Sequence, residues 1–252
     1  MRELGVTTDD EVAADLAAFV GEELVALQTR AKSSRQLGWW LEDEADSLAH
    51  DLLVKGFAEH RPEDAVLSEE GTDTSARLSS ARAWIVDPLD GSNGFGSGGD
   101  DWAVHVALTV DGEATAAAVS VPGLGEVFST ARPQPATVTS SPLVVVTGRS
   151  RSWIDGPPVA MALGATLETC GSAGVKAMLV VLGEADVYVH ASPLYEWDVC
   201  APVAVAESAG LVACAPDGSR LQFNNRRPVV PGIVVTRPEL VDRVVSALNV
   251  TT

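Results

Sequence analysis

The feature that most constrains the fold is an apolar segment that ends in a turn carrying two aspartates. Ala83-Trp84-Ile85-Val86 is predicted to form a buried strand, and Asp87-Pro88-Leu89-Asp90-Gly91-Ser92 follows it directly. Proline stiffens the turn, so the two carboxylates can converge on one point. Gly91 tolerates unusual backbone conformations, and the amides of Gly91, Ser92 and Asn93 can then face an anion. Hard oxygen ligands suit Mg²⁺, although such a turn alone could simply cap the next element.

Two further acidic pairs favour the metal interpretation. Leu67-Ser68-Glu69-Glu70 places carboxylates at the end of a second predicted strand, and Glu196-Trp197-Asp198 places another pair at a predicted helix start. An acidic residue there also complements the helix macrodipole, which is the alternative explanation for Asp198. If the three clusters meet, they can hold two or three cations, an arrangement that suits in-line attack of a metal-bound hydroxide on phosphorus.

The remaining pattern predicts two stacked α/β halves rather than one continuous doubly wound sheet. Thr8-Asp9-Asp10-Glu11 has the layout of a capping box, and a helix with apolar residues at near-helical spacing is expected to follow. A second helix is predicted from Glu42 to Glu59, with Leu48, Leu52 and Phe57 directed inward. Strict alternation predicts a strand from Trp102 to Val110. Further helices are expected at Ala173–Leu182, Trp197–Ala209 and Pro238–Leu248, and further strands at Ala65–Leu67, Ala116–Val121, Glu126–Ser129, Leu143–Val146, Asp186–His190 and Ile233–Val235.

A segment rich in Pro, Ser and Thr, Ala131 to Pro142, is the predicted linker between the halves. The chain is accordingly divided into residues 1–135, which carry the metal-binding turns, and residues 136–252, which complete the site.

Charge and composition exclude several classes of function. The net charge of −18 argues against binding to a nucleic acid polymer or an anionic membrane. An acidic protein that handles an anionic substrate needs local positive charge, which bound divalent cations can supply. No apolar run has the roughly 18 residues of a membrane span. The first ten residues lack a signal-peptide layout, and three cysteines without C-x-x-C spacing suit a reducing compartment. These features predict a cytoplasmic protein.

The acidic blocks resemble, in order and spacing, the signature of the inositol monophosphatase-like family. They comprise Glu69-Glu70, then Trp84 to Ser92, then Trp197-Asp198 with Ala209-Gly210 downstream, so the resemblance extends over nearly the whole chain. It implies a layered α-β-α-β sugar-phosphatase fold made of two packed α/β halves, and a magnesium-dependent phosphomonoesterase that binds two or three ions. Members of this family are commonly homodimers, while the residues of this chain do not fix an oligomeric state.

The resemblance also implies roles for individual residues. Magnesium ligands are expected at Glu69, Asp87, the carbonyl of Leu89, Asp90 and Asp198. Ser92 stands where the family usually has threonine and keeps the hydroxyl that orients the attacking water. Glu70 and Asp46 are expected to support this water and a weakly held third cation. For Asp46, in Asp43-Glu44-Ala45-Asp46, a solvated helix face is an equal alternative.

Within the family, several segments are similar to actinobacterial 3′-phosphoadenosine 5′-phosphate phosphatases, which are 3′(2′),5′-bisphosphate nucleotidases. They are Ala65–Glu70, Asp100–His105, Gly171–Ala177 and Tyr195–Asp198. This similarity implies hydrolysis of that nucleotide to AMP and phosphate, with substrate contacts from Gly91, Ser92, Asn93, Gly171, Ser172, Lys176 and Glu196. Lys176 could instead be a solvated helix lysine. The glycine-rich segment after the turn, Asn93 to Gly99, departs from the expected pattern and could change specificity.

Two other functions stay open at this stage. One is an inositol monophosphatase, a fructose-1,6-bisphosphatase or another pathway-specific phosphatase. The other is a catalytically silent metal or phosphate binder, which the presence of every expected ligand disfavours. The formula G-x-G-x-x-G at Gly94–Gly99 is rejected as a dinucleotide fingerprint because a strand is predicted next, where a helix is required. His105, inside the alternating strand, is predicted to be structural.

Overall fold

The structure is a computed structural model that describes residues 7–138, 142–151 and 154–249. Two predictions fall partly outside these residues. They concern the N-terminal segment, of which residues 1–6 are outside, and the predicted linker, of which residues 139–141 are outside. The described parts of the linker, 131–138 and 142, form no helix or strand. Among the helices of the described residues, none combines the length and apolar character that crossing a membrane requires.

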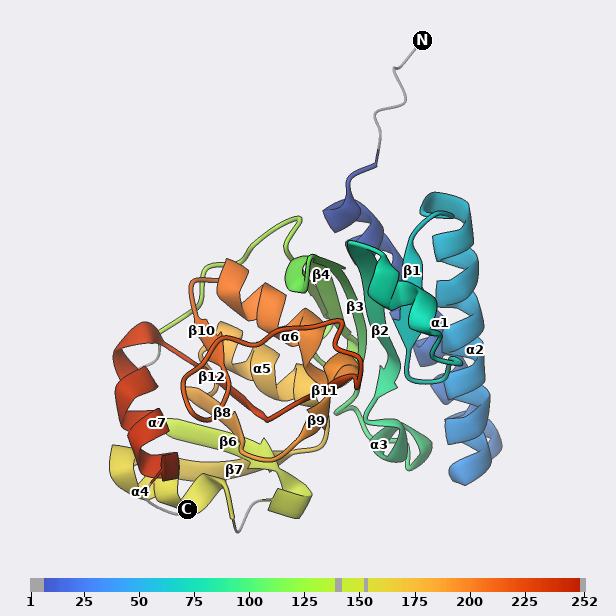
Figure 1. Ribbon diagram of the computed structural model, residues 1–252. Helices are drawn as coiled ribbons and strands as arrows, with labels where there is room; N and C mark the ends of the chain where they lie inside the picture. The colour runs from blue at the N-terminus through green and yellow to red at the C-terminus, as the bar shows by residue number, and fades with distance from the viewer. Residues whose placement is uncertain (1–6, 139–141, 152–153, 250–252) are drawn as a thin grey trace.

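Two long helices cover the outer face of the first sheet (Figure 1). Helix α1 (Asp9–Ser34) starts at a capping box, in which Thr8 Oγ1 accepts from the Glu11 amide and Glu11 accepts from the Thr8 amide. Helix α2 (Trp39–His60) begins earlier than predicted. The predicted inward face is confirmed: Phe57 is buried, and Leu48 and Leu52 are partly buried and pack against the same core.

The first sheet has five strands in the order β1-β2-β3-β4-β5. Only the β1–β2 pair is parallel. The strands are β1 (Ala65–Ser68), β2 (Arg82–Asp90), β3 (Ala103–Val110), β4 (Glu113–Val121) and β5 (Glu126–Ser129). The predicted alternation in β3 is confirmed: Val104, Val106 and Leu108 face the core under α1 and α2, while Ala103 and Ala107 face the second core. Both faces of this sheet are therefore covered.

Helices α5 (Ala173–Leu182) and α6 (Glu196–Ser208) lie between the two sheets (Figure 1). The second sheet has the order β10-β12-β8-β6-β7. Its strands are β6 (Val144–Gly148), β7 (Thr166–Cys170), β8 (Val187–His190), β10 (Val212–Cys214) and β12 (Ile233–Thr236). Its far face packs against α4 (Gly156–Leu163) and α7 (Val241–Asn249). The predicted α-β-α-β layering is confirmed and is completed by this outer helical layer.

Three small elements surround the ends of β2 and α6. Helix α3 (Ser92–Gly96) follows β2, and the strands β9 (Leu194–Tyr195) and β11 (Val229–Val230) form an antiparallel ribbon beside the start of α6. The 3₁₀ helices lie at Ser75–Ser79, Pro122–Leu124, Arg149–Arg151 and Pro238–Leu240. Because α6 packs against β2, β3 and β4, acidic residues from both halves of the chain can approach one another.

Candidate active site

The aspartate turn is built as an irregularity at the end of β2. The β2–β3 pairing is regular up to Asp87, which is opposite His105, and then shifts so that Asp90 is opposite Ala103. Asp87 Oδ1 accepts from the Leu89 amide at 3.0 Å, which closes the turn locally. Gly91 has φ +95°, and a Cβ there would lie 2.8 Å from the Asp101 carbonyl oxygen. The sequence therefore needs glycine at this position to bring the two aspartates to one end of the strand.

Glu69 follows the neighbouring strand and meets Asp87. The Glu69 amide donates to the Val86 carbonyl at 3.4 Å, and the Glu69 carboxylate acts electrostatically on Asp87. Burial raises the pKa of both groups; the charges of Asp90 and Asp198 add to the effect at Asp87, and that of Glu70 adds at Glu69.

Asp198 reaches the same region from the first turn of α6. Its Oδ2 accepts from the Tyr195 amide at 3.1 Å, which fixes the carboxylate at the helix start. Burial, together with the charges of Asp90 and Glu69, raises the pKa of Asp198 to about 7. The mutual effects on pKa mean that these carboxylates, which come from distant parts of the sequence, act on one another through a shared electrostatic environment.

Asp90 differs from its acidic neighbours because donors surround it. Its Oδ2 accepts from Ser172 Oγ at 2.5 Å and from the Gly174 amide at 2.8 Å, and it lies 3.2 Å from His105 Nε2. Burial alone would raise the pKa of Asp90. His105, Lys176 and Ser172 outweigh burial and hold the pKa below its ordinary value.

Asp46 and Glu70 lie on the open side of this group. Burial and the charges of Glu70 and Glu69 raise the pKa of Asp46 to about 7. Asp46 is half-buried on its helix. Its predicted role toward water or a third cation stays a prediction, as does that of the exposed Glu70.

The donor chemistry of these residues fits divalent magnesium. Carboxylates that raise one another's pKa concentrate negative charge, which a hard cation with oxygen ligands neutralises. Within residues 7–138, 142–151 and 154–249, however, no three acidic, histidine or cysteine side chains are arranged so that they could hold a metal ion as they stand. Asp87 Oδ1 and Asp90 Oδ2 instead accept hydrogen bonds from protein groups, so ion binding requires the carboxylates to adjust.

The predicted substrate-binding turn is tied to the acidic group. Ser172 caps α5 by accepting from the Val175 amide at 3.0 Å while its hydroxyl donates to Asp90. Lys176 is 2% exposed and donates to the carbonyl oxygens of Gly171 at 2.7 Å and Ser172 at 2.5 Å. The solvated alternative for Lys176 is therefore wrong, while direct contact with a nucleotide stays a prediction. Its ammonium shapes the turn from within.

Glu196 holds a neighbouring loop in place. It is fully buried, and its carboxylate accepts from the amides of Asn224 and Asn225 at 2.7 and 2.9 Å and from Asn225 Nδ2 at 2.7 Å. Contact with a substrate hydroxyl stays a prediction and would have to coexist with these bonds. Ser92 and Asn93 begin α3, whose first amides lack intrahelical acceptors. Their predicted phosphate contacts are compatible with this arrangement and stay predictions.

Two features of the site escaped the sequence interpretation. His105 was predicted to be structural, and its alternating strand gave no sign that its ring lies against Asp90. Asp101 accepts from the Gly171 amide at 2.9 Å and lies 2.6 Å from Arg149 Nη2, which ties the end of the first sheet to the second half. No local motif marks these contacts, since each joins residues far apart in the sequence.

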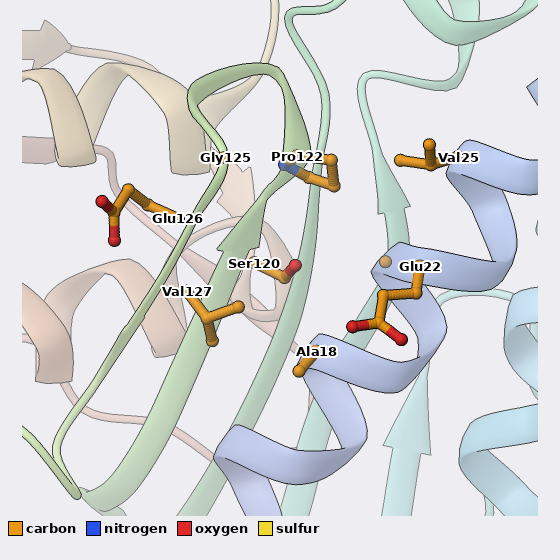
Figure 2. A pocket seen from close by; sticks show the side chains of 9 residues that line it. Ala18, Glu22, Val25, Ser120, Pro122, Gly125, Glu126 and Val127 are labelled. Carbon is orange, nitrogen blue, oxygen red and sulfur yellow. The ribbon is translucent and has the colours of Figure 1, made fainter.

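An apolar hollow lies away from the acidic group. It has a volume of about 310 Å³ and lies between α1 and the β4–β5 connection (Figure 2). Glu22, Val25, Ser120, Pro122 and Val127 are among its lining residues, and none of the predicted site residues is. The acidic group is therefore identified by its charge and hydrogen bonds and not by this hollow.

Comparison with known proteins gives a consistent set of relatives. The profile of the inositol monophosphatase family matches residues 9–249. A protein of Mycobacterium tuberculosis named 3′-phosphoadenosine 5′-phosphate phosphatase is 40% identical over 236 residues, covering 88% of this chain and 87% of its own length. The Mycobacterium leprae protein of the same name is 38% identical over 249 residues, covering 92% and 90%. The crystal structure of the extragenic suppressor protein suhB from Bartonella henselae has a TM-score of 0.76 at 22% identity, covering 95% of this chain and 97% of that chain.

Proposed function

Because this chain belongs to the inositol monophosphatase family, we propose that it is a magnesium-dependent phosphomonoesterase that hydrolyses 3′-phosphoadenosine 5′-phosphate to AMP and phosphate. The observation that carries the proposal is the convergence of Asp87, Asp90 and Asp198, whose charges act on one another although they come from both halves of the chain. Such a concentration of buried and half-buried carboxylates destabilises a protein unless cations neutralise it. The choice of substrate rests on the names of the two mycobacterial relatives.

The proposed ligands are the carboxylates of Glu69, Asp87, Asp90 and Asp198 together with the carbonyl oxygen of Leu89. Magnesium bound there supplies polarisation of the phosphoryl group, a lowered pKa for the attacking water and charge stabilisation at the leaving oxygen. Two or three ions suit this number of ligands. The ligand residues must turn from their present partners toward the cations, and because the pKa of Asp87 is raised, cation binding competes with its protonation.

The remaining residues position the reactants. The Ser92 hydroxyl orients the water, and Glu70 with Asp46 accepts its proton. The water oxygen forms a bond to phosphorus as the bond from phosphorus to the 3′ oxygen breaks, and the departing oxygen takes up a proton to become the ribose hydroxyl. The amides of Gly91, Ser92 and Asn93, at the start of α3, bind the phosphate oxygens.

The nucleotide is proposed to lie against the turn that leads into α5. Gly171 and Ser172 line it, Lys176 contributes a buried positive charge from beneath, and Glu196 orders the loop around Asn224. An inositol or sugar phosphatase would use the same metal ligands with a different pocket. Identity of 40% and 38% to two proteins named for the nucleotide favours the nucleotide substrate. A silent binder is disfavoured because every proposed ligand is present in the sequence.

The proposal places the protein in the cytoplasm, where a reducing environment suits three cysteines that are buried and unpaired. Its partner is a small phosphorylated substrate rather than a nucleic acid or a membrane, consistent with the net charge of −18. We include a homodimer in the proposal on family membership alone. Sedimentation of the purified protein would test the dimer.

The experiment is phosphate release from 3′-phosphoadenosine 5′-phosphate, inositol 1-phosphate and fructose 1,6-bisphosphate, each with and without Mg²⁺. Asp90→Asn should abolish release. Asp100→Asn is the matched control, because Asp100 is an exposed acidic side chain on the same connection and forms an ion pair with Lys32 at 3.5 Å. Preference for the nucleotide supports the proposal. Preference for a sugar phosphate would overturn the substrate, and the absence of Mg²⁺-dependent release would overturn the activity.

A further inference from the structure

We infer that His105 is a positioning residue that sets the orientation of Asp90 for cation binding and couples it to the Trp197–Asp198 segment. The inference rests on the proposed function, because it concerns how strongly the proposed ligands hold magnesium. His105 is fully buried in the middle of β3. Both of its ring nitrogens face oxygen atoms that belong to, or adjoin, proposed metal ligands.

The first contact is with Asp90. His105 Nε2 lies 3.2 Å from Asp90 Oδ2, the same oxygen that accepts from Ser172 Oγ and the Gly174 amide. The register shift in β2 makes this contact possible, because it brings Asp90 opposite Ala103, one residue pair along the same face from His105. The two hydrogen bonds from Ser172 and Gly174 hold this oxygen, and the buried imidazole packs against it, so together they restrict the orientation of the carboxylate. The other oxygen, Oδ1, takes no part in these contacts.

The second contact reaches the other half of the site. His105 Nδ1 lies 3.1 Å from the Trp197 carbonyl oxygen, in the residue that precedes Asp198. The imidazole therefore spans from a ligand at the end of β2 to the first turn of α6. Groups that hydrogen-bond to metal ligands without touching the metal restrict how the ligands move and raise metal affinity. His105 lies in that position beside one proposed ligand, Asp90, and reaches the residue before another, Asp198.

The packing of α5 is matched to the imidazole. A Cβ at Gly174 would overlap His105 Nε2 and would lie 3.1 Å from Ala103 Cβ. Glycine thus lets the start of α5 approach β3 closely enough for its amide to donate to Asp90 Oδ2 at 2.8 Å. A histidine that only filled the core would not require α5 to pack so closely on β3, nor would it need an oxygen atom next to each ring nitrogen.

The test compares His105→Phe, which keeps a planar ring but removes both nitrogens, with Thr109→Val. Thr109 is the matched control: it lies on the same face of β3, is equally buried and makes one side-chain hydrogen bond, to the Ala83 carbonyl at 2.9 Å. Binding of Mg²⁺ alone is measured by titration calorimetry. We expect His105→Phe to weaken Mg²⁺ binding by about 10- to 100-fold. We expect no change in Thr109→Val, and kcat of His105→Phe to recover largely at saturating Mg²⁺.

Two further variants guard against a folding defect. His105→Asn supplies a polar side-chain amide in place of the imidazole and should bind Mg²⁺ more tightly than His105→Phe. Gly174→Ala keeps the histidine but displaces its ring, and should weaken Mg²⁺ binding as the Phe variant does. Unchanged Mg²⁺ affinity in folded His105→Phe or in folded Gly174→Ala, or an equal loss in Thr109→Val, would overturn the inference alone. Failure of the unmodified protein to bind Mg²⁺ would overturn it together with the proposed function.

Discussion

Replacing Asp198 by asparagine should stabilise the protein when divalent cations are removed. In the fold, burial and the charges of Asp90 and Glu69 oppose ionisation of Asp198. Asparagine has nearly the same shape and carries no charge. Its side-chain oxygen can still accept from the Tyr195 amide, the bond that Asp198 makes at 3.1 Å. The substitution therefore removes repulsion and keeps the helix start intact.

The size of the effect follows from the pKa of Asp198, which rises from 3.8 to about 7 on folding. That rise of about three units corresponds to about 4 kcal/mol of lost unfolding free energy once the group is ionised, at 1.36 kcal/mol per unit. Neighbouring carboxyl groups can take up a proton instead, so we expect a gain of about 2–4 kcal/mol in Asp198→Asn. Because the folded pKa is raised, the carboxylate's destabilising effect is absent below pH 3.8 and grows until about pH 7.

The assay is urea unfolding of both proteins with a chelator at several pH values, repeated with Mg²⁺. With the chelator, the advantage of the variant should grow from pH 3.8 toward pH 7 and then level off. Saturating Mg²⁺ should reverse part of this advantage, because a ligand at 100 times its Kd adds about 2.7 kcal/mol to the unfolding free energy of the protein that binds it. A variant that is less stable than the unmodified protein at neutral pH in chelator, or a difference independent of pH, would refute the electrostatic reasoning.

Two further predictions concern groups outside the proposed metal ligands. Arg82 Nε and Nη2 donate to Asp64 at 2.9 and 2.7 Å. Asp64→Asn should therefore lower the unfolding free energy at neutral pH by about 1–2 kcal/mol, a figure kept small because Arg82 is partly exposed to solvent. The Arg82 hydrogen bond lowers the pKa of Asp64, so the stability lost in Asp64→Asn should shrink as the pH falls below 3.8. Denaturant unfolding at acid and at neutral pH checks this, and a loss of stability that is independent of pH would contradict it. Glu196→Gln should leave a donor at the Asn224–Asn225 loop without an acceptor, costing about 1–3 kcal/mol. Hydrogen exchange at those two amides should speed up, and unchanged protection would argue against the anchoring role.

The elements that the sequence predicted well are those with strong local signals. The capping box at Thr8 and Glu11 predicted the start of α1, and β3 followed its alternating pattern. Helix α5 has the predicted bounds, Ala173–Leu182. In each case the periodicity or cap that determines the structure is contained in a few consecutive residues.

What the sequence did not predict depends on packing between distant segments. Helix α3 lies within a glycine-rich stretch that lacks helical periodicity, and it forms where the chain turns away from β2. The burial of Lys176 follows from the carbonyl oxygens that its ammonium meets in the turn before α5. The contact of His105 with Asp90 needs the register shift of β2. Partners of this kind become visible only when the elements are assembled.

The most direct test of the central claim is hydrolysis of 3′-phosphoadenosine 5′-phosphate in water enriched in heavy oxygen, with Mg²⁺ and with a chelator. The account predicts that release requires Mg²⁺, that the heavy oxygen enters the phosphate, and that AMP contains none. This result follows if water attacks phosphorus at the carboxylate-bound cations. Heavy oxygen in AMP, or equal release in the chelator, would contradict the account.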